Sequence, residues 1–162
     1  MNAAVTTRPV QLPEDTELLL AIYRSTRDSE MADFGWTEDE VDRFVTFQFD
    51  AQSRYYADYF PEAEHSVVVV DGTPAGRLLV ERSGNAVHIV DISLLPSFRR
   101  CGVGAELVHG LLEEAKADRV PVTCHVEPGN DARLFWKRMG FVERSGPDAY
   151  IALEHPCGTL PT

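Results

Sequence analysis

A turn rich in glycine and arginine contains the residues whose types and spacing most clearly suggest a ligand. Within the segment ISLLPSFRRCGVGAEL (residues 92–107), Arg99 and Arg100 are followed by Gly102 and Gly104, at the start of a predicted helix. Glycines let backbone N–H groups approach a ligand closely, and a helix N-terminus attracts phosphate oxygens. The arginines add charge-assisted donors. The turn therefore predicts a phosphate-binding site, although an ordinary strand-to-helix turn with solvated arginines fits the same residues.

Two familiar glycine-rich phosphate motifs do not fit this turn. A Walker loop continues with lysine and Ser/Thr after its last glycine, whereas Ala105 and Glu106 follow here. A dinucleotide fingerprint needs a third small residue where this sequence has Leu107, and it needs an early βαβ unit. The strands predicted before the turn are antiparallel, so they do not supply that unit.

Three ionisable side chains near this turn are candidates for a general base. His88 lies six residues before Leu94, on the same face of the predicted strand if no bulge intervenes, and Asp91 lies on the other face. His125 lies on the next predicted strand. Imidazole suits proton transfer near neutral pH, although a lone histidine on a strand is more often a hydrogen-bonded structural residue.

The elements that position these residues follow from hydrophobic periodicity and turn residues. Pro13 predicts the opening of a first helix that runs to about Asp28, and the capping box of Thr37 and Glu40 predicts a second that runs to about Tyr59. The remaining predicted elements are a strand at 5–10, antiparallel strands at 65–70, 75–82 and 86–95, a helix at 102–117, a parallel strand at 120–127, a helix from 130 to 140, and a hairpin of 141–146 with 149–155.

Two glutamines interrupt the apolar stripe of the second predicted helix. Gln48 and Gln52 lie near the middle of that stripe, where an unpaired polar side chain is costly. They are interpreted either as hydrogen-bonded core glutamines or as groups that line a cleft.

The pattern Arg-x-x-Gly-x-Gly at Arg99, Gly102 and Gly104 resembles the acyl-CoA pyrophosphate loop of the GNAT superfamily of N-acetyltransferases. A second block, NDARLFWKRMGF at 130–141, resembles that family's Asn...Ala...Leu-Tyr...Gly-Phe segment. The order of predicted elements also agrees over nearly the whole chain. We therefore expect residues 1–162 to form a single α/β domain of GNAT type, with a mixed twisted sheet of about seven strands and four helices on its faces.

The resemblance implies that an acetyl group passes from acetyl-CoA, the co-substrate, directly to a primary amine of a small molecule or peptide, and no metal is expected. Leu94 and Leu95 would contact the pantetheine, with the Leu94 N–H polarising the thioester carbonyl as an oxyanion-hole donor. Asn130 would bond the pantetheine arm from the opposite side. The backbone contacts to the pyrophosphate would come from Arg99, Arg100, Cys101, Gly102, Val103 and Gly104.

The amine must lose a proton before or during attack, so a base is required, and His88, His125 and Asp91 remain the candidates. Cys124 is not expected to share a proton with His125, because adjacent strand residues point to opposite faces. Both Cys124 and Cys101 are interpreted as small apolar residues.

Trp136 departs from the family pattern. It stands where many relatives carry a tyrosine that is thought to protonate the departing CoA thiolate, and an indole N–H is no acid near neutral pH. Trp136 is therefore predicted to pack or stack at the cofactor site, and Tyr150 is the nearest later tyrosine. The departure supports an alternative function, a non-catalytic acyl-CoA sensor or interaction module. A nucleotide-binding protein of another fold is a third hypothesis.

The net charge of the chain bears mainly on the second substrate. Fifteen Lys and Arg against 26 Asp and Glu give 15 − 26 = −11, which disfavours a nucleic-acid partner and favours a cationic amine. The resemblance places acceptor specificity between the first two strands, in a segment that includes Phe34 and Trp36. Three cysteines without CxxC spacing, and no signal or membrane segment, predict a cytoplasmic protein. The acceptor, the acyl-chain preference and the oligomeric state, which includes a homodimer, stay open.

Overall fold

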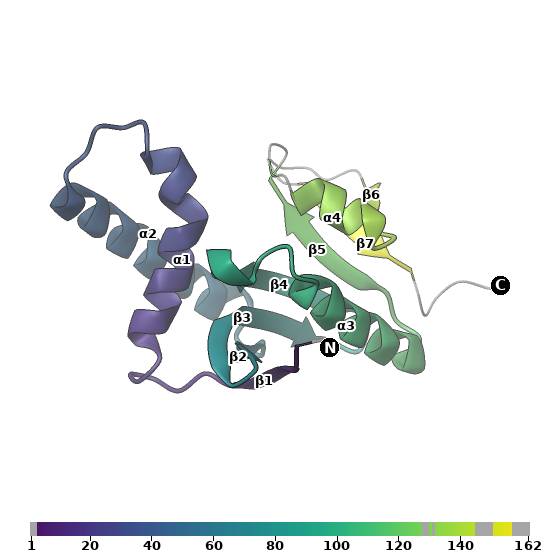
Figure 1. Cartoon of the computed structure of the whole chain (residues 1–162). Helices are drawn as coiled ribbons and strands as arrows, with labels where there is room; N and C mark the ends of the chain where they lie inside the picture. Colours follow the sequence, from purple (N-terminus) through teal and green to yellow (C-terminus); the bar gives the residue numbers. More distant parts are fainter. Residues whose placement is uncertain (1–2, 128–129, 131, 145–150, 157–162) are drawn as a thin grey trace. The chain divides into compact units, whose positions relative to one another are not determined.

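A computed structural model describes residues 3–127, 130, 132–144 and 151–156 (Figure 1). These residues form seven strands, four α-helices and one short 3-10 helix. The elements are β1 (Val5–Pro9), α1 (Thr16–Met31), α2 (Glu38–Tyr59), β2 (Glu64–Val70), β3 (Thr73–Arg82), β4 (Val87–Leu94), η1 (Pro96–Phe98), α3 (Val103–Asp118), β5 (Val122–Val126), α4 (Ala132–Arg138), β6 (Val142–Arg144) and β7 (Ile151–His155). None of the described helices is both long enough and apolar enough to cross a membrane.

The strands form one mixed sheet in the order β1-β2-β3-β4-β5-β7-β6, which confirms the predicted α/β fold. β4 and β5 are parallel, as the helix between them predicted, with His88 in register with Thr123. The predicted terminal hairpin of β6 and β7 is antiparallel. Strand β7 also pairs antiparallel with β5, so the last strand lies between β5 and β6. The hairpin prediction did not include that insertion.

The described residues divide into two compact units. One contains the chain up to Leu78 together with Ile92–Arg99, and the other contains Leu79–Asp91 together with the chain from Arg100 onward. Strands β3 and β4 contribute to both units.

Helix α1 begins and ends three residues later than predicted, at Thr16 rather than Pro13 and at Met31 rather than Asp28. The Asp15 carboxylate accepts two hydrogen bonds from Arg8, at 2.8 and 2.9 Å, and one from the Gln11 N–H at 2.8 Å. The bond from Arg8 is the main reason why the pKa of Asp15 falls to about 2. These contacts fix the chain before the helix in a turn, and they depend on a side chain from β1 that local sequence signals do not reveal.

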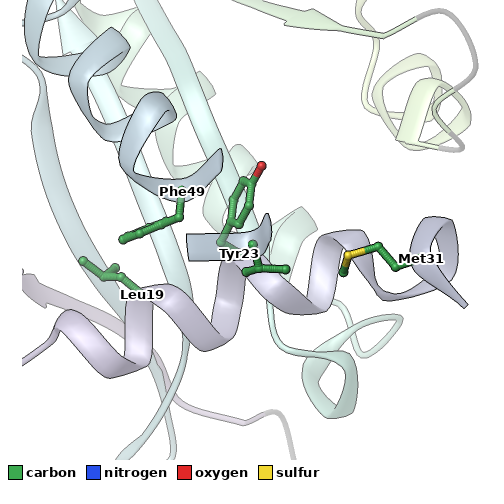
Figure 2. Close-up of a cluster of buried hydrophobic side chains, with 5 residues drawn as sticks. Leu19, Tyr23, Met31 and Phe49 are labelled. Atoms are coloured by element: carbon green, nitrogen blue, oxygen red, sulfur yellow. The ribbon is translucent and has the colours of Figure 1, made fainter. Parts of the chain in front are cut away.

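Helix α2 starts as its capping box predicted. The Thr37 hydroxyl oxygen accepts from the Glu40 N–H at 3.2 Å, and the Glu40 carboxylate lies 3.2 Å from that hydroxyl. The helix packs on α1 through a buried hydrophobic cluster (Figure 2) that consists of Leu19, Tyr23, Met31, Val45 and Phe49. The burial of Met31 in this cluster accounts for the longer C-terminal end of α1.

Both glutamines of the α2 stripe are hydrogen-bonded. The Gln48 Oε1 accepts from the Tyr23 hydroxyl at 3.2 Å, and the Gln52 Oε1 accepts from the Arg77 guanidinium at 2.6 Å. Each glutamine is half-buried. The interpretation as satisfied glutamines is therefore confirmed.

Strands β2 and β3 are joined by the predicted tight turn. Asp71 and Gly72 have φ of 49° and 82°, and two consecutive positive φ values are what a type I′ hairpin requires. Farther along β3, a Cβ on Gly76 would lie 2.1 Å from the Ser93 carbonyl oxygen. The backbones of β3 and the end of β4 therefore approach too closely for any side chain at this position.

We predict opposite effects of alanine at two glycines. Gly76→Ala should lower the free energy of unfolding by about 2 kcal/mol or more, because the methyl group forces β3 and β4 apart. Gly110→Ala is the matched control: its Cβ meets nothing within 4 Å in α3, so the better helix former should stabilise by about 0.5–1 kcal/mol. Urea denaturation measures both. Wild-type stability in Gly76→Ala would contradict the close approach.

Candidate functional site

The turn before α3 contains two residues with positive φ and ends at a glycine N-cap. Arg100 and Gly102 have φ of 59° and 83°, and Gly102 is the N-cap of α3 without a side-chain cap. The first helical bond runs from the Glu106 N–H to the Gly102 carbonyl at 3.0 Å. The N–H groups of Val103 and Gly104 therefore precede the first intrahelical donor and are directed out of the helix end.

The space around the two glycines of this turn is open or only loosely filled. A Cβ on Gly102 would meet no atom within 4 Å, and one on Gly104 would make only ordinary contacts of 3.6 and 3.7 Å with the Phe135 ring. Neither position needs glycine for lack of space. Gly102 alone of the two has a positive φ, which favours glycine there. The amides, the helix dipole and the exposed Arg100 form an environment that suits the pyrophosphate of an acyl-CoA.

The Arg99 side chain forms hydrogen bonds to other residues of the protein. Its Nε donates to the Leu94 carbonyl oxygen at 2.8 Å. Its Nη2 donates to the Ser25 hydroxyl at 3.1 Å and to the Ser25 carbonyl at 3.4 Å. Sequence reasoning missed Ser25, which lies 74 residues away on α1, since no local signal links the two residues.

The end of β4 is the predicted contact for pantetheine. Leu94 and Leu95 are both half-buried. The Leu95 N–H donates to the Ala75 carbonyl at 2.7 Å, so this amide is engaged within the protein. The contact expected of Leu95 would therefore come from other atoms of the residue.

The two candidate histidines lie together in the second unit. His88 Nδ1 is hydrogen-bonded to Thr123 Oγ1 at 2.7 Å, and the His88 and His125 ring centroids are 5.3 Å apart in an edge-on arrangement. Burial, and secondarily the nearby His125, lowers the pKa of His88 to about 4. His125 is exposed. His88 is thus neutral near pH 7. Thr123, which sequence reasoning did not single out, could have been found only from the β4–β5 register.

Asp91 and the two cysteines near the turn and on β5 differ from the histidine pair in their surroundings. Asp91 is half-buried on β4. Burial raises the pKa of the Cys124 thiol to about 12, which makes it inert as a nucleophile and supports its interpretation as an apolar residue. Cys101 is exposed in the turn before α3.

Of the second motif, Asn130 precedes helix α4 and Trp136 lies within it. The Asn130 side-chain oxygen accepts from the Ala132 N–H at 2.8 Å, so Asn130 caps this helix as predicted. Trp136 is only 4% exposed and packs edge-on against Phe135 and Phe141, at centroid distances of 5.1 and 4.9 Å. Burial to this extent leaves little indole surface for a ligand. Tyr150, the other residue considered for the acid step, lies outside the described residues.

Comparisons with known proteins assign the family. The model of the Acetyltransferase (GNAT) family matches residues 22–141, well over half of the chain, so the chain belongs to this family. No curated protein sequence matches the chain at a significant level.

Solved structures share the fold at low sequence identity. The PaiA N-acetyltransferase of Thermoplasma acidophilum, solved in complex with coenzyme A, has a TM-score of 0.68 at 15% identity, over 93% of this chain and 98% of that one. The ribosomal-protein-S18-alanine N-acetyltransferase of Escherichia coli has a TM-score of 0.62 at 16% identity, over 98% and 97%. Ard1 from Thermoplasma volcanium has a TM-score of 0.58 at 22% identity, over 94% and 97%.

We predict that His125→Gln raises the pKa of His88. The substitution removes the smaller cause of the low value and leaves burial, so the pKa should rise above about 4 but stay below the ordinary 6.5. NMR titration of the His88 ring protons measures it. An unchanged pKa would contradict the pairing of the two rings.

The same lowered pKa makes stability depend on pH. The unfolded chain protonates His88 below pH 6.5 and the folded chain only below about 4, so this residue lowers the free energy of unfolding as pH falls between these values. In His88→Asn the stability should decline less steeply across this window, as measured by urea denaturation at a series of pH values. Equal slopes in the two proteins would show that His88 does not contribute.

Proposed function

We propose that the protein is an N-acetyltransferase that moves an acetyl group from acetyl-CoA to a primary amine of a small molecule or peptide. The observation that carries this proposal is the start of α3, where the N-cap Gly102 has a positive φ and carries no side chain that could cap the first-turn amides. Membership in the Acetyltransferase (GNAT) family supports it. The coenzyme A in the structurally similar PaiA N-acetyltransferase supports the choice of CoA as the phosphate-bearing ligand.

The residues that would hold acetyl-CoA come from the β4–α3 segment and from the start of α4. The pyrophosphate would be held by the backbone from Arg99 to Gly104 and by the Arg100 side chain, and the pantetheine by Leu94, Leu95 and Asn130. Bound acetyl-CoA supplies an acetyl group activated as a thioester. The Leu94 N–H is then the donor that stabilises negative charge on the acyl oxygen.

His125 is the histidine that we assign as the general base. A base must bind a proton readily at the working pH, and a pKa of about 4 makes His88 a weak proton acceptor near neutrality. His125 is exposed on the adjacent strand, so it can pass the proton to solvent. His88, held by Thr123 at 2.7 Å, then serves as its ordered neighbour, and Asp91 is the remaining candidate.

The acceptor that the first unit favours is a cationic amine. Phe34 and Trp36 are 50% and 38% exposed, and the Trp36 ring lies 4.9 Å from Phe34 and 5.0 Å from Phe44 between centroids. Three carboxylates follow in the first turn of α2, at Glu38, Asp39 and Glu40. Exposed aromatic faces beside carboxylates attract ammonium groups.

One observation favours a second function, a sensor that binds acyl-CoA without transferring the acyl group. Trp136 replaces the tyrosine expected from the family resemblance, and it is buried, so it does not supply a proton to the thiolate. Thiolate is a good leaving group, which lets water take this role in the enzyme. CoA release that depends on an added amine would exclude the sensor function.

We predict amine-dependent release of CoA thiol from acetyl-CoA in a panel of small cationic amines and basic peptides. His125→Gln should lower kcat/KM by about 100-fold or more, the usual contribution of a positioned base. His109→Gln, which changes an exposed histidine on α3, is the matched control and should retain wild-type kcat/KM. If no amine raises thiol release above background, the transferase proposal is wrong. Equal losses in the two variants would reject His125 as the base.

A further inference from the structure

We propose that the Arg99 side chain is a positioning residue, which holds the backbone at Leu94 and ties it to helix α1, and that it is not a ligand of the CoA pyrophosphate. The inference rests on the proposed function, because it concerns the orientation of the proposed Leu94 donor. It assigns different tasks to two consecutive arginines, since Arg100 keeps its place in the phosphate-binding turn.

The peptide that joins Leu94 to Leu95 is held at both polar ends. Its carbonyl oxygen accepts from Arg99 Nε at 2.8 Å, and its N–H donates to the Ala75 carbonyl at 2.7 Å. These two bonds hold the plane of this peptide, and therefore fix the position of the Leu94 Cα to which the proposed donor N–H is attached. This restricts the directions in which the Leu94 N–H can point, and an oxyanion donor works only when its direction is fixed in advance.

Ser25 is a rigid anchor for the other end of the guanidinium. Its hydroxyl donates to the Ile22 carbonyl at 2.7 Å, which leaves oxygen lone pairs for Arg99 Nη2 at 3.1 Å. The preceding residues Ile22 and Tyr23 are 0% and 5% exposed, so this turn of α1 is anchored in the core. The guanidinium therefore connects the end of β4 to a part of the unit that moves little.

The bonds that Arg99 makes within the protein occupy one edge of its guanidinium. Nε and Nη2 form one of the two edges through which a guanidinium makes paired bonds to an oxyanion, and here this edge bonds to Leu94 and Ser25. Moving it to a phosphate would break these bonds. Arginine can donate to both the Leu94 carbonyl and the Ser25 hydroxyl because its guanidinium carries several N–H groups in one rigid plane. The single ammonium group of lysine does not reproduce this geometry.

The first test separates positioning from phosphate binding by comparing Arg99→Ala, Arg99→Lys and Arg100→Ala. We expect both Arg99 variants to lose about 10-fold or more in kcat, while the dissociation constant for CoA, from calorimetry, changes less than about threefold. Arg100→Ala should weaken CoA binding by more than threefold, with kcat less affected. Arg100→Ala leaves the backbone strain at this position unchanged, because Arg and Ala both carry a Cβ at φ 59°.

The second test needs neither CoA nor turnover. Hydrogen exchange of the Leu95 amide should be about 10-fold faster or more in Arg99→Ala. The Leu94–Leu95 peptide loses the hydrogen bond to its carbonyl oxygen in this variant and keeps only the bond from its N–H. In urea denaturation, Ser25→Ala should lower the unfolding midpoint, and the double variant Ser25→Ala/Arg99→Ala should unfold at nearly the midpoint of Arg99→Ala. Ser25→Ala introduces a better helix former into α1, so the variant should fold and remains informative if Arg99→Ala does not fold.

The outcomes distinguish this inference from the proposed function. If wild type neither binds CoA nor releases thiol, the proposed function fails, whereas faster Leu95 exchange and the non-additive midpoints still support the link from Arg99 to Ser25. Full activity in Arg99→Lys, or a 10-fold weaker CoA affinity with unchanged kcat in Arg99→Ala, overturns the positioning role. Additive midpoints with unchanged Leu95 exchange overturn it as well.

Discussion

The close approach of β3 and β4 at Gly76 is the constraint on which the rest of the proposed site depends. A Cβ there would lie 2.1 Å from the Ser93 carbonyl oxygen, so only glycine permits this spacing. The spacing lets the Leu95 N–H reach the Ala75 carbonyl directly after β4 ends at Leu94. The peptide that follows the proposed donor is therefore held to β3.

In the turn before α3, the place of each arginine in the fold determines what its side chain does. Arg99 and Arg100 are adjacent and chemically identical, yet Arg100 has a positive φ in the turn while Arg99 bonds to the end of β4 and to α1. The ligand-facing groups of such a turn are mainly backbone amides, because Gly102 admits the required φ and leaves the helix end uncapped. The acidic chain can therefore offer an anion site without a large basic surface.

The two histidines illustrate how burial divides tasks within a pair. Their rings lie 5.3 Å apart, but burial lowers the pKa of His88 to about 4, while His125 lies exposed. Cys124, next to His125 in the chain, faces the opposite side of β5 and is buried, where its thiol pKa rises to about 12. Parallel pairing of β4 and β5 sets this arrangement by placing His88 opposite Thr123.

The sequence by itself determined the features that depend on neighbours in the chain: the α2 cap at Thr37, the Asp71-Gly72 turn, the capping of α4 by Asn130, and the motif that indicated the acetyltransferase family. The features that depend on tertiary contacts are the later start of α1 at Thr16, the place of β7 between β5 and β6, the burial of Trp136, and the bonds that Arg99 makes to Ser25. The physical reason is how far apart in the chain the interacting residues lie. Caps and turns are set by hydrogen bonds across a few residues, whereas burial and side-chain pairing are set by segments far apart in the chain that meet only in the folded protein.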